Sequence, residues 1–384
     1  MICFLQKEAS EVVKICYTGG GTAGHIIPAL VVADALRTEL ASEKLPLDAF
    51  WIGSKDESEQ ALIRAAGIRC YGISSGKLRR YFSMKNFTDV FRIMGGVFRS
   101  LTILRKERPD VLFSKGGFVS VPPVMAAWLL RIPAITHESD ASVGLATRIN
   151  ARFVSKVCVS SADAAKGLQN RYQEKVVVTG NPVRKEILAG DPEKGRALIG
   201  IGKNEPLILV LGGSLGALQI NELVWGGLDA LCAQAFVVHQ TGKKTWRAVE
   251  HDRYRGVPYL HDELPDLLAA ATVVVSRAGA GALAELVALG KPMLLLPLGT
   301  NASRGDQILN AERLSQAGAA EVLYQEDASQ RAFLDRLLRL LQERKRRESL
   351  SAACGRIADT CGAIRIVAEL LSACKFRENE VRGT

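Results

Sequence analysis

The residues best suited to chemistry follow an apolar run at positions 273–275. Gly279 and Gly281 come shortly after that run, and Glu285 lies in the segment that follows. Open α/β sheets bind ligands at the carboxyl ends of their strands, where glycine lets backbone amides approach closely and a helix presents its positive end. We therefore expect an anion such as phosphate at this turn. A carboxylate at Glu285 can accept two hydrogen bonds from neighbouring hydroxyls, such as those of a ribose.

The same plan opens the chain, where a short apolar run at 12–17 leads into a glycine turn. Its glycines are Gly19, Gly20, Gly21 and Gly24. The spacing fits the dinucleotide pattern G-x-G-x-x-G, but the second apolar run ends without the expected acidic residue, so we do not expect NAD. The turn indicates an anion site on the amides of Thr22, Ala23 and Gly24. His25 is either a group that takes part in the chemistry or a hydrogen-bonded residue at the start of a helix.

Two further strands are expected to end in groups suited to a ligand. Gly116 and Gly117 follow the first of them, and a polar cluster follows the second. The cluster is His137, Glu138, Ser139 and Asp140. Polar residues at the carboxyl end of a strand commonly belong to a ligand site in this fold class. Capping of the next helix explains Ser139 or Asp140 equally well.

The organisation repeats after residues 181–184. The segment 186–205 is polar and rich in turn residues, and the apolar run at 207–211 then leads into a second glycine turn. This turn contains Gly212, Gly213, Ser214 and Gly216. Two strand–glycine–helix starts in one chain predict an α/β protein with two Rossmann-like domains that face each other across a cleft. The cleft is then the expected site.

Composition narrows the class of protein. The chain has 384 residues, 48% of them hydrophobic and 23% charged, which is typical of a globular protein large enough for two domains. Eight cysteines without a CxxC pair predict reduced thiols in a cytoplasmic protein and no zinc site. No apolar run reaches the roughly 18 residues that span a bilayer. The net charge of +10 predicts anionic partners. Nucleic acid is disfavoured, because the basic residues lack a recognised motif.

Much of the positive charge lies between residues 77 and 108. Apolar side chains recur there at helical spacing, which predicts a helix with a core side and a solvated basic side. These apolar residues are Phe87, Phe91, Met94, Phe98 and Leu101. The alternative is a surface that binds anionic lipid, with exposed apolar residues ringed by charge; both can hold at once. The expected membrane patch is Lys77, Leu78, Arg79, Arg80, Tyr81, Phe82 and Lys85.

Several long motifs, taken in order and with their spacing, resemble one known family. They are TGGGTAGHIIPAL, SKGGFVSVPPVMAAW, HESD, TGNPVR, LGGSLGALQIN, HQTGK and SRAGAGALAE. The chain is similar to the MurG family of N-acetylglucosaminyltransferases over most of its length. The resemblance implies a GT-B fold and an inverting transfer of GlcNAc from UDP-GlcNAc to the C4 hydroxyl of a lipid-linked MurNAc-pentapeptide. It also implies peripheral attachment to the cytoplasmic face of the bacterial inner membrane, and wall-synthesis proteins as partners.

The resemblance assigns roles to two domains. Residues 11–182 would form an acceptor and membrane domain, with helices from about 361 packing back on it, and residues 183–360 would bind UDP-GlcNAc. In the second domain Glu285 would hold the ribose, Leu260 the uracil through its backbone, and Gln307 the GlcNAc. The other donor-site residues implied are Thr22, Ala23, Gly24, Asp140, Arg184, Ser214, Ala280, Gly281, Ala282, Leu283 and Ala284. The loop that holds the acceptor diphosphate would be Gly19, Gly20, Gly21, Gly116 and Gly117.

The chemistry of an inverting transfer requires a base for the acceptor hydroxyl and positive charge for the departing UDP. The resemblance makes His25 the candidate catalytic residue, with Glu138 as a second. We expect neither a metal nor another cofactor, because helix amides and arginine can hold the UDP. The chain departs from the family at Asp140, where Asn is usual, at Phe118, where some members have Tyr, and at Asp306. A UDP-GlcNAc 2-epimerase and a non-catalytic UDP-sugar-binding scaffold remain the alternatives.

Overall fold

The described part of the chain forms two compact units. The structure is a computed structural model that describes residues 12–21, 23–76, 84–213, 216–299 and 305–382. Thr22, Ser214 and positions 77–82 of the expected membrane patch lie outside these ranges. Unit 1 consists of Met1–Pro182 with Thr360–Thr384, and unit 2 of Val183–Asp359. Each unit contains a parallel sheet with helices between successive strands, which confirms the expectation of two Rossmann-like domains.

Unit 1 is built on a seven-stranded sheet in the order β3-β2-β1-β4-β5-β6-β7, and the described strand pairs are parallel. In chain order the strands are β1 (Val13–Thr18), β2 (Leu47–Gly53), β3 (Arg69–Gly72), β4 (Val111–Ser114), β5 (Ala134–Glu138), β6 (Lys156–Val159) and β7 (Val176–Val178). The strand order reverses between β1 and β4. Sheets of this class bind ligands beyond the carboxyl ends of their strands at this reversal.

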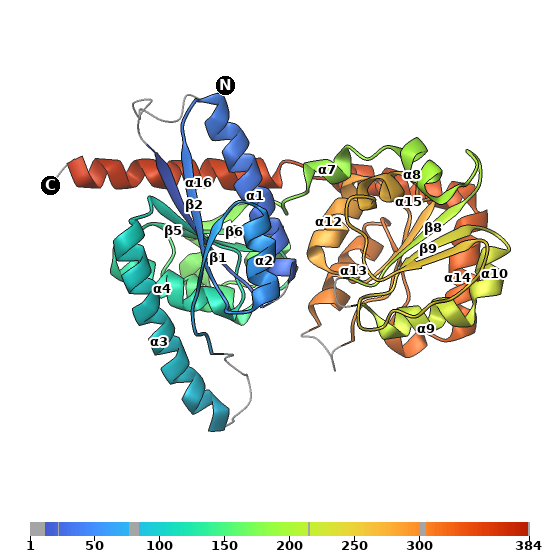
Figure 1. Ribbon diagram of the computed structural model, residues 1–384, viewed down its shortest axis with the longest axis horizontal. Coiled ribbons are helices and arrows are strands. Elements are labelled where there is room, and N and C mark those ends of the chain that lie inside the picture. Colours follow the sequence, from blue (N-terminus) through green and yellow to red (C-terminus); the bar gives the residue numbers. More distant parts are fainter. Residues whose placement is uncertain (1–11, 22, 77–83, 214–215, 300–304, 383–384) are drawn as a thin grey trace. The chain divides into compact units, whose positions relative to one another are not determined.

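Helices cover both faces of this sheet (Figure 1). They are α1 (Ala23–Ser42), α2 (Glu57–Ala65), α3 (Met84–Glu107), α4 (Val121–Leu129), α5 (Leu145–Asn150), α6 (Ala162–Lys166) and α16 (Gly362–Arg382), with short 3-10 helices η1 (Phe118–Ser120) and η2 (Asn170–Lys175). Leu36 of α1 and Leu370 of α16 share one buried cluster, and Leu104 of α3 and Val124 of α4 share another. The last helix of the chain is therefore part of the core of unit 1.

Helix α3 corrects the prediction for its apolar residues. Phe91, Met94 and Phe98 are 67%, 47% and 64% exposed, so they do not form the core side of the helix. The buried side instead contains Val97, Ser100, Ile103 and Leu104. Periodicity identified an apolar side correctly, but it could not show that another side faces α4. Figure 1 shows the first half of α3 extending beyond the sheet of its unit.

Unit 2 repeats the topology with a six-stranded sheet in the order β10-β9-β8-β11-β12-β13, again with parallel pairs. In chain order the strands are β8 (Leu207–Leu211), β9 (Phe236–Gln240), β10 (Tyr254–Val257), β11 (Val273–Ser276), β12 (Met293–Leu295) and β13 (Glu321–Val322). The reversal falls between β8 and β11. Both strands lead into glycine turns found from the sequence, so these turns lie side by side at one edge.

The helices of unit 2 are α7 (Lys185–Leu188), α8 (Pro192–Ile199), α9 (Leu218–Gly226), α10 (Leu228–Cys232), α11 (Leu264–Ala270), α12 (Ala280–Ala288), α13 (Asp306–Gln316), α14 (Gln330–Gln342) and α15 (Arg344–Ile357), with the 3-10 helix η3 (Gln325–Asp327). The segment expected to be turn-rich contains α7 and α8. Asp191 caps α8 by accepting from the amides of residues 193 and 194, Pro192 occupies its first turn, and Gly200 ends it in a left-handed conformation. These are ordinary helix signals that the polar composition concealed.

Replacing Leu370 with alanine should test the contribution of α16 to the core. Leu370 is fully buried, so Leu370→Ala should lower the free energy of unfolding by about 2–5 kcal/mol. Ile364 lies on the same helix and is 63% exposed, so Ile364→Ala should change it by less than about 0.5 kcal/mol. Urea unfolding of the full chain measures both. Equal, small effects would show that α16 does not stabilise unit 1.

Candidate active site

The glycine turn after β11 leaves the start of α12 open. Gly279 is the N-cap residue, and no described side chain caps the helix. A Cβ added at Gly279 or Gly281 would meet no heavy atom within 4 Å, so there is space beside both residues. The first backbone amides of a helix lack intrahelical partners and carry partial positive charge. The arrangement suits an anion, and residues Ala280 to Ala284 form the first turn that would hold it.

Arg184 and Glu285 form a bidentate ion pair. Arg184 Nε donates to Glu285 Oε1 at 2.6 Å, and its terminal nitrogen donates to Oε2 at 2.8 Å. The side chains are 31% and 13% exposed. These hydrogen bonds raise the pKa of the Arg184 guanidinium above its usual value. Each carboxylate oxygen of Glu285 keeps a second lone pair that can accept from a hydroxyl. The structure therefore brings two predicted donor-site residues together and fixes the orientation of Glu285.

Two glutamines fix the loops around this turn. Leu260, expected at the uracil, donates its amide to Gln240 Oε1 at 3.0 Å, and Gln240 Nε2 donates to the carbonyl of Gly213 at 3.1 Å. Gln307 Oε1 accepts from the amide of Leu298 at 3.0 Å. Gln240 thus connects the expected uracil position to the glycine turn after β8. Sequence reasoning did not single out Gln240, although its position at the end of β9 was the available signal.

Arg277 and Asn310 were also not identified as site residues from the sequence. Arg277 follows β11 directly, and its guanidinium donates to the carbonyl of Leu296 at 2.9 Å and to Gln219 Oε1 at 3.2 Å. Burial lowers the pKa of this guanidinium. Asn310 of α13 donates to the carbonyl of Ala278 at 3.1 Å. Asn310 therefore holds the glycine turn from one side, while Arg277 brings positive charge to its start.

The first glycine turn of unit 1 is held by a carboxylate from α2. The amide of Gly21 donates to Glu59 Oε1 at 2.8 Å, and Ser54 Oγ donates to Glu59 Oε2 at 2.5 Å. Trp51 Nε1 donates to the carbonyl of Gly19 at 3.2 Å. Gly21 has φ of 95°, in the region that favours glycine. Glu59 fixes a turn 38 residues away, a contact that local sequence patterns cannot reveal.

Gly117 brings the second glycine loop against His25. A Cβ added at Gly117 would lie 2.5 Å from the carbonyl oxygen of Gly20 and 3.2 Å from Cδ2 of the His25 ring. Only glycine permits this approach, and φ of 75° at Gly117 also favours glycine. The structure therefore collects Gly20, Gly117 and His25 at one place. His25 is the third residue of α1.

Glu138 accepts hydrogen bonds from the loop that follows it. Its Oε1 accepts from the amides of Ser139 at 3.1 Å and Asp140 at 3.4 Å. Its Oε2 accepts from the amide of Gly144 at 2.9 Å and from Thr147 Oγ1 at 2.7 Å. The side chain is buried. With four accepted hydrogen bonds, the carboxylate of Glu138 fixes the loop after β5. These bonds favour a positioning role for Glu138 over direct proton transfer.

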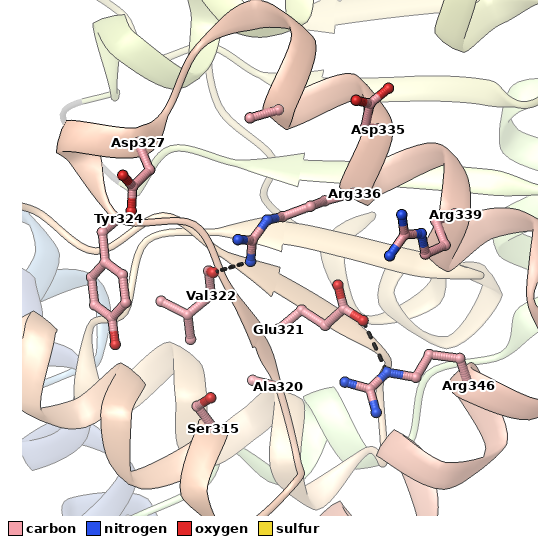
Figure 2. A pocket seen from close by; sticks show the side chains of 11 residues that line it. Ser315, Ala320, Glu321, Val322, Tyr324, Asp327, Asp335, Arg336, Arg339 and Arg346 are labelled. Carbon is pink, nitrogen blue, oxygen red and sulfur yellow. Dashed lines mark hydrogen bonds and ion pairs between the residues drawn. The ribbon is translucent and has the colours of Figure 1, made fainter.

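A pocket of about 640 Å³ lies at the edge strand β13 of unit 2, apart from the residues above (Figure 2). Its arginines are used locally: Arg336 donates to the carbonyl of Val322 at 2.6 Å, and Arg346 pairs with Glu321 at 2.9 Å. The residues lining this pocket include none of the predicted site residues. Both guanidiniums are already bound to groups of strand β13. We therefore do not assign the donor to this pocket.

The described ranges contain no group of three or more His, Cys, Asp or Glu side chains that could hold a metal ion. Within the same ranges, no helix has the length and apolar character needed to cross a membrane.

The chain matches two family models, described as the glycosyltransferase family 28 N-terminal domain over residues 15–159 and the corresponding C-terminal domain over residues 207–360. The fold and the two matches define a GT-B glycosyltransferase. A relative from Bacillus cereus is 46% identical over 335 residues, which is 87% of this chain and 93% of that protein. It is named UDP-N-acetylglucosamine--N-acetylmuramyl-(pentapeptide) pyrophosphoryl-undecaprenol N-acetylglucosamine transferase 2. The chain belongs to the MurG family.

Solved structures agree on the fold. MurG of Acinetobacter baumannii superposes with a TM-score of 0.70 at 22% identity, covering 94% of this chain and 99% of that one. A UDP-GlcNAc 2-epimerase from Neisseria meningitidis, solved with UDP-GlcNAc, gives a TM-score of 0.63 at 14% identity, covering 94% and 100%. Because the transferase and the epimerase share this architecture, the fold alone does not choose between the two reactions.

Arg184→Lys should show whether the guanidinium orients Glu285 for binding. Lysine keeps the charge but cannot form the two parallel hydrogen bonds, so we expect UDP to bind about 10-fold more weakly. Glu285→Gln should weaken binding as well, and the double variant should lose less than the sum because the residues act as one unit. Isothermal titration with UDP measures all three. Arg331→Lys, at a 93% exposed side chain of α14, is the matched control. Additive losses would contradict the coupling.

Proposed function

We propose that this chain transfers GlcNAc from UDP-GlcNAc to the C4 hydroxyl of undecaprenyl-diphosphoryl-MurNAc-pentapeptide, with inversion at the anomeric carbon. The product is the disaccharide lipid used for peptidoglycan. Membership of the MurG family supports this choice of substrates. The observation that carries the donor side is the Arg184–Glu285 pair beside the uncapped start of α12. It combines an acceptor for ribose hydroxyls with amides for a diphosphate.

Unit 2 has the groups that a departing UDP requires. When the bond from the anomeric carbon to the diphosphate breaks, negative charge develops on the leaving oxygen. Amides at the start of α12 stabilise this charge without a change in their own orientation. Glu285 holds the ribose, the backbone at Leu260 meets the uracil, and Gln307 meets the GlcNAc. These contacts position the donor, so that its anomeric carbon is open to the incoming hydroxyl.

Unit 1 supplies the acceptor side of the reaction. The C4 oxygen of MurNAc forms the new bond to the anomeric carbon, and its proton passes to a base. His25 is our candidate for the base, because it lies against the loop of Gly117 beside the first glycine turn. The loops of Gly19, Gly20, Gly21, Gly116 and Gly117 would hold the acceptor diphosphate. Asp140, at the end of β5, would contact the sugars.

Helix α3 supports an encounter with the membrane that carries the acceptor. Phe91, Met94 and Phe98 are exposed, and the neighbouring Arg92 and Arg99 are exposed as well. Exposed aromatic residues beside arginines suit the interface of a bilayer with anionic headgroups. The protein would therefore bind peripherally at the cytoplasmic face of the inner membrane, where wall-synthesis proteins would be its neighbours.

The deciding experiment is transfer of labelled GlcNAc from UDP-GlcNAc to a short-chain analogue of the lipid-linked MurNAc-pentapeptide, with released UDP measured in parallel. We expect labelled disaccharide lipid and UDP in equal amounts, and none of either without the acceptor. His25→Ala should lower kcat by about 100-fold or more while the donor Kd stays nearly constant. Conversion of UDP-GlcNAc without the acceptor would favour the epimerase instead. Donor binding without product would favour a scaffold.

Vesicle binding tests the role of α3. The double variant Phe91→Ser/Phe98→Ser should bind vesicles containing phosphatidylglycerol about 10-fold more weakly or worse, because each buried phenyl ring contributes on the order of 1.5–3 kcal/mol. Ile364→Ser removes a similarly exposed apolar side chain from α16 and should leave binding unchanged. Pelleting with the vesicles measures both. Unchanged binding of the double variant would remove α3 from the membrane surface.

A further inference from the structure

A lysine side chain is buried next to the glycine loops of unit 1. Lys115 is the first residue after β4, and its amide donates to the carbonyl of Thr18 at 2.8 Å. The residue is only 2% exposed and is among the largest fully enclosed side chains. None of the ion pairs among the described residues includes its ammonium. A charge without a close partner costs several kcal/mol to bury, so a reason for its presence is required.

The residue beside it offers no compensation. His137 of β5 is fully buried, and its Nε2 donates to the carbonyl of Gly180 at 2.9 Å. Its Nδ1 has no partner among the described residues. Burial lowers the pKa of His137 well below its usual value, so the ring is neutral. A neutral imidazole cannot neutralise the charge of Lys115.

Two carboxylates act on Lys115 without pairing with it. The charges of Glu138 and Asp140 favour its protonated form, while burial acts more strongly and lowers its pKa. Glu138 already accepts four hydrogen bonds within its own loop, so it is fixed there. Lys115 therefore keeps a capacity to attract a further anion.

The glycine loops lie directly over this lysine. A Cβ added at Gly19 would lie 3.3 Å from Lys115 Cβ and 3.3 Å from the carbonyl oxygen of Gly116. Helix α1 begins at Ala23, after the same turn, and its first turn contains no acidic residue. The positive end of a 20-residue helix and a buried lysine thus adjoin the same pair of loops. Both features favour the same ligand, which is a phosphate-containing anion.

We propose that Lys115 is a binding residue for the diphosphate of the lipid-linked acceptor, acting from beneath loops 19–21 and 116–117. This inference rests on the proposed function, because it takes the acceptor from there. The ammonium provides a fixed positive charge in a site of low polarity, where charges interact more strongly than in water. The unfavourable burial of Lys115 in the free protein is then relieved when the acceptor binds.

Lys115→Met tests the proposal, since methionine has a similar shape and no charge. We expect the KM for the short-chain acceptor to rise by about 10- to 100-fold, in keeping with the loss of a contact to a charged group. The KM for UDP-GlcNAc should stay within about twofold, because Lys115 is assigned to the acceptor diphosphate and is not one of the donor-site residues. The melting temperature should rise, because a buried unpaired charge is replaced by an apolar side chain. Lys156→Met, at the start of β6 and 45% exposed, is the control and should change neither KM.

The outcomes separate this inference from the proposed function. Wild-type protein that forms no disaccharide lipid would overturn the function itself, whatever Lys115 does. Wild-type turnover with an unchanged acceptor KM in Lys115→Met would overturn only the role of Lys115. Lys115→Gln is the second variant, and should raise the acceptor KM in the same way. A melting temperature that falls sharply in both variants, with equal losses for both substrates, would assign Lys115 to folding and contradict the proposal.

Discussion

Parallel pairing of neighbouring strands is the constraint on which the rest of the structure depends. Thr18 of β1 is in register with Ser114 of β4, and Leu211 of β8 is in register with Ser276 of β11. In each unit, the two strands therefore end at the edge of their own sheet where the glycine turns begin. Parallel pairing requires a crossover to the opposite end, and each crossover helix starts where a strand has just ended. In both units the chain must therefore place open helix starts beside one another, which makes an anion site a consequence of topology.

Topology places the turns, but polar side chains that are buried or partly buried fix their shape. Glu59 holds the first turn of unit 1, Glu138 holds the loop after β5, and Asn310 holds the turn before α12. In each case a side-chain oxygen or amide bonds to backbone groups of the loop. Removing such a partner leaves a buried donor or acceptor unsatisfied, which costs more than the hydrogen bond itself contributes. The loops are consequently held in shape before a ligand arrives, and this lowers the entropy lost on binding.

The strands and the glycine turns could be predicted from the sequence because each carries a local pattern, and Glu285 was proposed as a site residue from its place after one of these turns. Apolar runs marked β1, β8 and β11, and glycine marked their ends. The pair of Arg184 with Glu285 spans 101 residues, and no local pattern reports which of many carboxylates an arginine meets. The prediction that Phe91, Met94 and Phe98 form the core side of α3 failed for a related reason. Helical periodicity groups side chains on one side, but only the packing of α4 decides which side is buried.

Two positive groups at these loops differ in whether a carboxylate neutralises them, and that difference implies different ligands. Arg184 is paired with Glu285, so the pair is close to neutral and suits uncharged hydroxyls that donate to the carboxylate. Lys115 forms none of the ion pairs found among the described residues, although the charges of Glu138 and Asp140 act on it, so its charge can attract an anion. A sugar nucleotide and a lipid diphosphate both carry phosphate, and backbone amides alone would attract either one. Arg277 brings positive charge to the turn of unit 2 as well. What distinguishes unit 2 is therefore the Arg184–Glu285 pair, which would add a preference for the hydroxyls of a sugar nucleotide that glycine loops alone could not provide.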